Sequence, residues 1–314
     1  MRFTKMQGLG NDYVYVDAAT EPELEALDWP QLAIEMSDRH TGIGGDGVIL
    51  ICPAKNDTNH ARMRTFNADG SESGACGNGT RCVARFVRER LGMDDATLRI
   101  ESGQRVLECE PIDHGHVRVA MGAPGFSMHD CGIEPALLVS SDPTSIQVAG
   151  HNLAFHAVSM GNPHAVAFAS DNPWLDQDLA SEIRRLGPLI EHHQAFTERI
   201  NAHFVSIDDS AHAIMHTWER GAGPTRACGT GACAAHVAAV LVGLLESNAT
   251  LRLPGGDLQI SWTQKDRGGD GIVRQSGPAD FVFDGTMNRS ADTEPGEWAW
   301  IDTKKPTEPT TRHS

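Results

Sequence analysis

An internal duplication constrains the fold of this chain more than any other feature of its sequence. Residues 75–80 (Ala-Cys-Gly-Asn-Gly-Thr) recur as residues 227–232 (Ala-Cys-Gly-Thr-Gly-Ala), 152 positions later. Three further landmarks repeat in the same order: residues 11–14 and 162–165, residues 65–67 and 217–219, and residues 97–100 and 250–253. A shared order of four landmarks predicts two similar halves.

Each half shows the pattern of a sheet with one helix. Short β-rich runs bounded by Gly, Pro, Asn and Asp predict strands at 13–16, 48–51, 117–119, 165–168 and 204–207. After each Cys-Gly-x-Gly turn the pattern predicts a helix, over 82–91, closing at Gly92, and over 233–241, running on past Gly243. The second helix is apolar nearly all round, which is typical of a buried helix. We therefore predict an α+β fold of two lobes, each a β-sheet wrapped around a central helix, with the active site in the cleft between them.

Length suggests the same division. A chain of 314 residues is long for one core, and the Ala-Pro-Gly segment at 123–125 is the expected boundary between an N-terminal lobe, 1–123, and a C-terminal lobe, 124–277. The tail at 289–314 is rich in Asp, Glu, Pro, Thr and Arg, and we expect it to be mobile, although Trp298 and Trp300 offer anchors.

Composition excludes several classes of function. The formal charge of −16 disfavours nucleic acids and anionic membranes as partners. Seven cysteines are too few for a disulfide scaffold, and the longest apolar run, 237–245, is far short of a membrane span. The N-terminus lacks the apolar stretch of a signal peptide. We expect a cytoplasmic protein with a small-molecule substrate, and the sequence leaves a homodimer open.

The repeated motif predicts a pair of reactive thiols. A cysteine at the start of a helix faces unpaired backbone N–H groups and the positive end of the helix dipole, which lowers the thiol pKa toward neutrality. The same N–H groups form a cradle for a carboxylate. One such turn is more often packing than chemistry. Two turns at matched positions, with Cys76 and Cys228 facing each other, suit the inversion of a stereocentre, in which one thiolate removes a proton and the opposite thiol supplies one.

Six separated segments closely resemble the diaminopimelate epimerase family. They are residues 8–12 (Gly-Leu-Gly-Asn-Asp), 66–72 (Phe-Asn-Ala-Asp-Gly-Ser-Glu), 76–82 (Cys-Gly-Asn-Gly-Thr-Arg-Cys), 160–164 (Met-Gly-Asn-Pro-His), 219–223 (Glu-Arg-Gly-Ala-Gly) and 227–233 (Ala-Cys-Gly-Thr-Gly-Ala-Cys). The resemblance covers residues 1 to about 285. It implies an isomerase that interconverts LL- and meso-2,6-diaminopimelate without a cofactor, a step of lysine and peptidoglycan precursor biosynthesis. It also implies the family's fold of two pseudo-twofold-related lobes, with segment 278–288 returning to the first lobe.

The resemblance assigns roles to individual residues. Cys76 and Cys228 are the expected catalytic pair, and Gly77, Asn78, Gly229 and Thr230 the expected carboxylate cradle. The expected readers of the substrate's ammonium groups and distal carboxylate are Asn11, Asn67, Asn162, Asn201, Glu219 and Arg220. His164 and Glu219 are expected near the thiols, where they help to set which thiol is ionised. Many family members carry Gln where this chain has Gly47, so one substrate contact is expected to be missing.

Other functions fit the sequence less well. Proline racemase and hydroxyproline epimerase also pair two cysteines, but they usually carry His at the position of Asn78. A pyridoxal-phosphate racemase needs a Schiff-base lysine, and none of the five lysines has a suitable setting. A cysteine hydrolase using His164 leaves one thiol idle, and an amino-acid-binding protein needs no thiol. Neither a metal nor a cofactor is expected, since the Cys76–Cys82 and Cys228–Cys233 spacings do not suit structural zinc.

The remaining cysteines and histidines are expected to be structural. Cys82 and Cys233 are predicted on buried helix faces and Cys52 and Cys109 in strands, while Cys131 has no assigned role. Most of the fifteen histidines are predicted at the surface, including His114, His116, His192 and His193. His164 is the exception, because of its motif.

Overall fold

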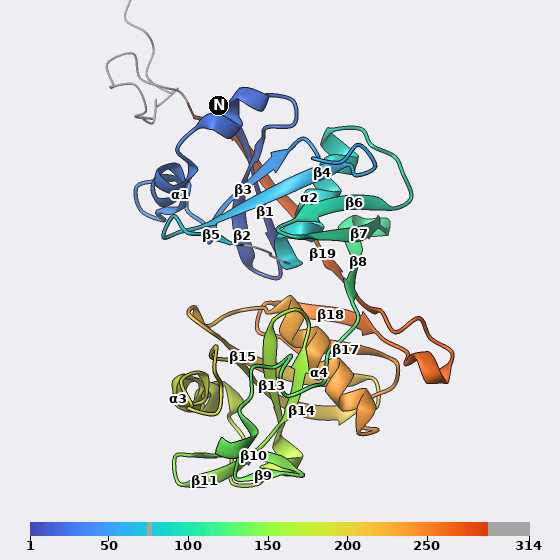
Figure 1. Cartoon of the computed structure of the whole chain (residues 1–314). Coiled ribbons are helices and arrows are strands. Elements are labelled where there is room, and N and C mark those ends of the chain that lie inside the picture. The colour runs from blue at the N-terminus through green and yellow to red at the C-terminus, as the bar shows by residue number, and fades with distance from the viewer. Residues whose placement is uncertain (74–76, 288–314) are drawn as a thin grey trace, which may run out of the picture.

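The computed structural model describes residues 1–73 and 77–287, which form two lobes of similar construction (Figure 1). Cys76 and the tail at 289–314, with Trp298 and Trp300, lie outside the described residues. None of the helices within the described part of the chain is long and apolar enough to cross a membrane.

The N-terminal lobe contains nine strands and two helices. They are β1 (Arg2–Gly8), β2 (Asn11–Asp17), α1 (Trp29–Ser37), β3 (Gly47–Cys52), β4 (Ala61–Asn67), β5 (Glu72–Ser73), α2 (Gly77–Arg90), β6 (Leu98–Ser102), β7 (Arg105–Pro111), β8 (His116–Gly122) and, from the other end of the described chain, β20 (Asp280–Thr286). The C-terminal segment joins this lobe because β20 pairs antiparallel with β1.

The C-terminal lobe repeats this plan and adds a small sheet. Its elements are β9 (Ser140–Ser141), β10 (Thr144–Val148), β11 (His151–Ala154), β12 (His156–Ser159), β13 (Pro163–Phe168), α3 (Leu179–Glu191), β14 (Asn201–Asp209), β15 (His212–Glu219), β16 (Gly223–Pro224), α4 (Gly229–Leu241), β17 (Asn248–Leu253), β18 (Gly256–Ser261) and β19 (Val273–Pro278). Short 3-10 turns occur at Pro22–Ala26, Asp113–Gly115, Pro135–Leu137, Ala169–Asp171 and Lys265–Arg267.

The two lobes have the same strand connectivity. In the first lobe, β1 and β2 pair antiparallel, β2 and β3 parallel, β3 and β4 antiparallel, and β4 and β6 parallel. In the second lobe, β12 and β13, β13 and β14, β14 and β15, and β15 and β17 repeat these four pairings with the same directions. Each lobe then ends in an antiparallel meander, β6–β7–β8 and β17–β18–β19. This equivalence confirms the two similar lobes predicted from the repeat.

The last strands of the two meanders join the lobes. β8 pairs antiparallel with β19, from Gly122 opposite Val273 to His116 opposite Pro278. An antiparallel pair of equivalent strands is related by a local twofold axis. The pairing therefore places the equivalent ends of the two lobes against each other, as Figure 1 shows where β8 and β19 meet at the junction. One hydrophobic cluster spans this junction, with Leu9 of the first lobe and Met160 of the second among its members.

Each lobe encloses one helix. α2 packs against β1, β6, β7 and β8, and α4 packs against β12, β13, β18 and β19. Ten of the thirteen residues of α4 are buried, as expected for its apolar sequence. The five strands predicted from β-rich runs all lie within observed strands: β2, β3, β8, β13 and β14.

The predicted helix ends need correction. Both helices begin earlier than predicted, at Gly77 and Gly229. Glycine lowers helix propensity, so the sequence predicts a turn at each Gly-x-Gly segment, but in the structure these residues form the first turn of the helix. The second helix does not run on past Gly243. It ends at Leu241, and Gly243 takes a left-handed conformation with φ of +76° that stops the helix.

The prediction for the histidines is wrong at two positions. His114, His116 and His192 are exposed and His193 is half-buried, but His203 and His236 are fully buried along with His164. His236 lies on α4, where its Nε2 is 3.3 Å from the carbonyl oxygen of Ser247. Burial lowers the pKa of His236 to about 4, so its imidazole is neutral in the folded protein.

The burial of His236 predicts a loss of stability in acid. The unfolded chain binds a proton at this ring below about pH 6.5, whereas the folded protein does so only near pH 4, so the free energy of unfolding falls as the pH drops between these values. We expect His236→Gln to flatten this fall by up to about 1.4 kcal/mol per pH unit. Denaturant unfolding at several pH values measures it, and an unchanged slope in the variant would contradict the assignment.

Candidate active site

Cys228 begins α4 in a buried position. It is the N-cap residue of the helix, its exposed fraction is 3%, and its Sγ accepts a hydrogen bond of 3.3 Å from the backbone N–H of Gly231. The hydroxyl of Thr230 lies 3.7 Å from the same sulfur. A helix N-terminus supplies these donors because its first N–H groups have no partner within the helix.

The thiol of Cys228 does not follow the pKa expected from the helix end alone. Burial raises the pKa of Cys228 well above its usual value, and the nearby carboxylate of Glu219 raises it further, which outweighs the donors from Thr230 and Gly231. In Cys228 the lowering of the pKa expected from the helix end is therefore outweighed, and the protonated thiol is favoured. A low-dielectric setting penalises the charged form of any acid more than one helix turn compensates.

Glu219 lies at the end of β15, beside Cys228. Its carboxylate accepts a hydrogen bond of 2.5 Å from the hydroxyl of Thr225. Burial raises the pKa of Glu219, although the hydrogen bonds to Thr225 and Cys228 act in the opposite direction. The expected proximity of Glu219 to one thiol is thus observed.

Three other expected substrate contacts of the C-terminal lobe surround this turn. Asn162, in the turn between β12 and β13, donates a long hydrogen bond of 3.4 Å to Thr230 Oγ1. Asn201, at the start of β14, donates to the carbonyl oxygen of Pro163 and accepts from the backbone N–H of Arg220. The guanidinium of Arg220 donates to the carbonyl oxygen of Glu198. Backbone and side chains of the motif segments thus hold one another in place.

His164 is part of a buried histidine pair. Its Nε2 lies 3.0 Å from Asn162 Oδ1, and its Nδ1 lies 2.9 Å from Nε2 of His203. Burial lowers the pKa of both rings, that of His203 to about 3, so both are neutral. Sequence reasoning missed His203. Its signal was the alternation of β14, which places it on the same inward face as Asn201 and Val205.

Asn78 connects the lobes. This buried residue of α2 donates a hydrogen bond of 3.2 Å to the carbonyl oxygen of Ala227, the residue before Cys228. It donates a second hydrogen bond of 3.4 Å to Asn11 Oδ1. Its own Oδ1 accepts 3.0 Å from the buried guanidinium of Arg81. Two expected site residues of the N-terminal lobe, Asn78 and Asn11, are thereby brought to the start of α4.

Asn67 lies at the end of β4, where it donates 2.9 Å to Ser71 Oγ. It is linked to Asn11 indirectly, through the loop that carries Asp46. Asp46 accepts 2.6 Å from Asn11 Nδ2, and its carbonyl oxygen accepts from the residue after Asn67. Asp46 is not predicted as a site residue from the sequence, although it directly precedes Gly47, where many family members carry Gln.

Gly47 leaves no room for a side chain. A Cβ at this position would lie 2.1 Å from the carbonyl oxygen of Phe66. A Gln could occupy the position only with a different path of the backbone, so the missing Gln contact is a property of this loop.

Gln275 is a third residue that the sequence did not reveal. It lies on β19, is fully buried, and faces the first glycine of both helices: a Cβ on Gly77 would be 3.2 Å from its Nε2, and one on Gly229 would be 2.9 Å from its Oε1. Its Nε2 donates to the sulfur of Met121. One side chain therefore separates the two helix N-termini, and no motif in the β19 sequence announces it.

The five other cysteines within the described residues, Cys52, Cys82, Cys109, Cys131 and Cys233, are buried. Burial raises the pKa of Cys52 and Cys233 to about 12 and that of Cys131 to about 11, and it raises that of Cys109. Cys82 and Cys233 lie in the core around α2 and α4, and Cys52 and Cys109 in strands, as predicted. Within residues 1–73 and 77–287, no three or more His, Cys, Asp or Glu side chains are placed to hold a metal ion.

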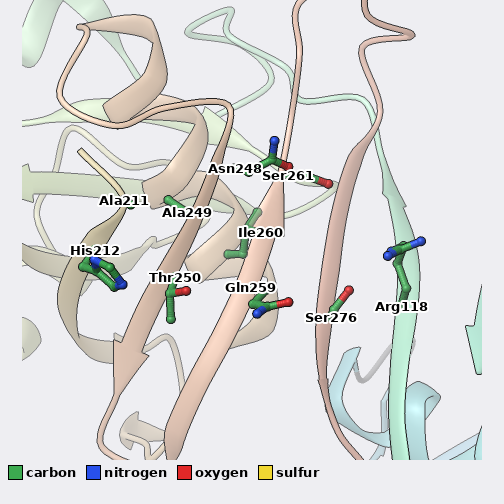
Figure 2. A pocket seen from close by; sticks show the side chains of 10 residues that line it. All are labelled: Arg118, Ala211, His212, Asn248, Ala249, Thr250, Gln259, Ile260, Ser261 and Ser276. Carbon is green, nitrogen blue, oxygen red and sulfur yellow. The ribbon is translucent and has the colours of Figure 1, made fainter. Parts of the chain in front are cut away.

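A surface pocket of about 310 Å³ lies apart from the residues described above. Figure 2 shows that it follows β17, β18, β19 and β8 and is lined by polar side chains such as Arg118, His212 and Gln259. None of the expected site residues lines it. We therefore give it no role in the chemistry.

Removal of the Glu219 charge is expected to lower the pKa of the Cys228 thiol, because that carboxylate disfavours the thiolate. In Glu219→Gln, alkylation of Cys228, followed by mass spectrometry across pH, should begin at lower pH than in the unmodified protein. Glu246→Gln, an exposed change beyond the far end of α4, is the matched control and should leave the profile unchanged. A shift toward higher pH in Glu219→Gln would contradict the account.

Comparison with known proteins covers nearly the whole described chain. Residues 3–127 and 156–282 match the family model described as diaminopimelate epimerase, and these two stretches correspond to β1–β8 and β12–β20. The diaminopimelate epimerase of Desulfitobacterium hafniense is 41% identical over 298 residues, covering 93% of this chain and 99% of that protein. That of Acaryochloris marina is 42% identical over 292 residues, covering 91% and 98%.

Solved structures share the fold at low sequence identity. A hydroxyproline epimerase from Agrobacterium vitis has a TM-score of 0.60 at 14% identity, covering 91% of both chains. A PhzF-family phenazine biosynthesis protein from Bacillus anthracis has a TM-score of 0.57 at 16% identity, covering 90% of this chain and 97% of that one. These two likenesses concern the fold alone. Together with the strand connectivity and the motif residues gathered around Cys228, the matches along the sequence show that the chain belongs to the diaminopimelate epimerase family.

Proposed function

We propose that this protein interconverts LL-2,6-diaminopimelate and meso-diaminopimelate without a cofactor, with Cys76 and Cys228 as the acid and base. Membership of the family supports this function, since its relatives carry the name diaminopimelate epimerase. The structural observation that carries it is the buried thiol of Cys228 at the start of α4, at the position equivalent to Cys76. Gly77, the residue after Cys76, opens the equivalent helix α2.

We infer a direction for the proton transfer from the surroundings of Cys228. Burial and Glu219 both raise the pKa of this thiol, which favours its entry into the reaction as the acid. Cys76 then acts as the thiolate that removes the Cα proton from one face, and the Cys228 thiol delivers its own proton to the other face. One proton leaves the carbon and one arrives, so the two sulfurs exchange protonation states, and the reverse reaction starts from the opposite pair.

The carbanion that forms between these steps needs stabilisation by the site. Backbone N–H groups at Gly229 and Thr230, with those at Gly77 and Asn78, are the proposed cradle for the reacting carboxylate. Removal of one such donor from an anion site typically costs about 2.7–4 kcal/mol. Burial increases this effect, because an electrostatic interaction is stronger where water is absent.

Six polar residues are proposed to recognise the two amino-acid ends of the substrate: Asn11, Asn67, Asn162, Asn201, Glu219 and Arg220. Glu219 can accept from an ammonium group and Arg220 can bind a carboxylate through two N–H groups. His164 is neutral, so we propose that it supports the site through Asn162 rather than as a charged group.

We also propose that the protein works in the cytoplasm. The six cysteines within the described residues are free thiols, which suits a reducing compartment.

Incubation with LL-diaminopimelate in D₂O, without added cofactor, tests the proposed reaction. We expect the meso isomer to appear with deuterium at the inverted Cα, because the delivered proton comes from a thiol that exchanges with solvent. Chiral chromatography with mass spectrometry follows both. If neither deuterium exchange nor the meso product appears, the proposed function is refuted. Deuterium uptake into proline instead would favour a proline racemase, the second two-thiol family.

Removal of either thiol should abolish turnover while the fold persists. Cys76→Ala and Cys228→Ala are each expected to lower kcat at least 100-fold, the lower end of the usual contribution of a positioned acid or base, about 10²–10⁴-fold. Cys131→Ala is the matched control, because Cys131 is buried in the separate cluster around α3 and the small sheet. Circular dichroism checks the fold of all three. Near-normal turnover by Cys76→Ala or Cys228→Ala would end the two-thiol mechanism.

A further inference from the structure

A continuous chain of polar side chains leads from the interior of the C-terminal lobe to Cys228. It begins at Thr217, whose Oγ1 lies 2.8 Å from His203 Nδ1, and continues from His203 Nε2 to His164 Nδ1 over 2.9 Å. From His164 Nε2 it reaches Asn162 Oδ1 over 3.0 Å. The Asn162 carboxamide then contacts Thr230 Oγ1 at 3.4 Å, and that hydroxyl contacts Cys228 Sγ at 3.7 Å.

With Asn162 Oδ1 facing His164 and its Nδ2 facing Thr230, the contacts set the direction of the first four hydrogen bonds of this chain. An amide oxygen only accepts, so the hydrogen between His164 and Asn162 belongs to His164 Nε2. A neutral imidazole has one N–H, which leaves His164 Nδ1 as an acceptor for His203 Nε2–H. His203 Nδ1 is then an acceptor too, and the hydroxyl of Thr217 must donate to it.

The other end of the chain follows from the same rule. The Asn162 Nδ2 group donates to Thr230 Oγ1. The Thr230 oxygen is the acceptor in this bond, so the hydroxyl hydrogen remains available to donate to another group. The Cys228 sulfur is within reach of that hydrogen. When the Thr230 hydroxyl donates to Cys228, all five hydrogen bonds run toward the sulfur, and this arrangement favours a thiolate there.

The inner three residues of this chain of hydrogen bonds are buried polar side chains that depend on one another for partners. His164 and His203 have no exposed surface and Thr217 has an exposed fraction of 2%. Burial of polar groups costs free energy unless each has a partner, and these three side chains provide partners for one another. His203 also packs on the turn that carries Cys228: a Cβ on Gly231 would be 2.3 Å from its ring, and the Gly231 N–H is the one that donates to Cys228 Sγ.

We propose that His203 and Thr217 are positioning residues for the reaction: they fix the tautomer of His164, and thereby hold the Asn162 carboxamide and direct the Thr230 hydroxyl onto Cys228. The proposal rests on the proposed function, because it assumes that Cys228 is a reacting thiol. It adds two buried residues that lie outside the six segments on which the family resemblance rests and that connect to Cys228 through His164, Asn162 and Thr230. Their effect is to offset part of the penalty that burial and Glu219 impose on the thiolate when Cys228 must act as the base.

The tautomers of the two rings test the chain in the unmodified, full-length protein. With histidine labelled with nitrogen-15, two-bond proton–nitrogen correlation spectra show which ring nitrogen carries the hydrogen, and a His164→Gln variant assigns the signals. We expect neutral His164 and His203 at neutral pH, both with hydrogen on Nε2. A hydrogen on His164 Nδ1, or a positive charge on either ring, would overturn the proposal even if the protein is an active epimerase.

Thr217→Val and Thr217→Ser form a matched pair of variants. Val has nearly the shape of Thr but no hydroxyl, so it leaves His203 Nδ1 without its donor, whereas Ser keeps the donor. We expect Thr217→Val to lower kcat about tenfold, which corresponds to the loss of about one hydrogen bond in support of the Cys228 thiolate, and to move the alkylation of Cys228 to higher pH. Thr217→Ser should stay within about twofold of the unmodified protein in both measurements.

The outcomes separate this proposal from the proposed function. Unchanged kcat and unchanged Cys228 alkylation in a folded Thr217→Val variant, even with a lower melting temperature, would reduce Thr217 and His203 to a structural role. If that variant does not fold, the tautomers of the unmodified protein decide. If the unmodified protein does not epimerise diaminopimelate, the proposed function fails, while the tautomers and the alkylation profile still report on the chain.

Discussion

The antiparallel pairing of β8 with β19 is the contact on which the rest of the arrangement depends. Each strand ends one copy of the repeated unit, so their pairing relates the two copies by a local twofold axis. The starts of α2 and α4 consequently face each other across one side chain, Gln275. Asn78 adds a direct hydrogen bond from α2 to the residue before Cys228. A duplicated sequence thus brings two equivalent helix starts together.

The site balances two opposing physical effects. Burial strengthens the hydrogen bonds available to the proposed carboxylate cradle, but the same burial raises the pKa of the Cys228 thiol. Hydrogen-bond donors counter part of this rise in the pKa. The Gly231 N–H donates to the Cys228 sulfur, and the Thr230 hydroxyl lies within reach of it. The neutral pair of His164 and His203 extends this response into the interior without adding a charge.

Sequence reasoning recovered the features that have a local signal. The repeat predicted the two lobes, β-rich runs predicted five strands, and the apolar pattern predicted the burial of α4. It failed where the outcome depends on distant contacts. The pKa of Cys228 follows from burial by both lobes, and the roles of Gln275 and His203 follow from strand register, none of which a motif encodes. The apolar pattern continues beyond the end of α4, whereas the left-handed conformation of Gly243 terminates the helix.

A crystal structure of the protein with bound diaminopimelate would test the central claim most directly, since it would locate Cys76 relative to Cys228. The account predicts that the two sulfurs lie on opposite faces of one Cα, each at about 3.5 Å, the separation of reacting atoms. It also predicts that the carboxylate on that carbon lies against the starts of α2 and α4. Two sulfurs on the same face, or a substrate bound away from the junction of the lobes, would contradict it.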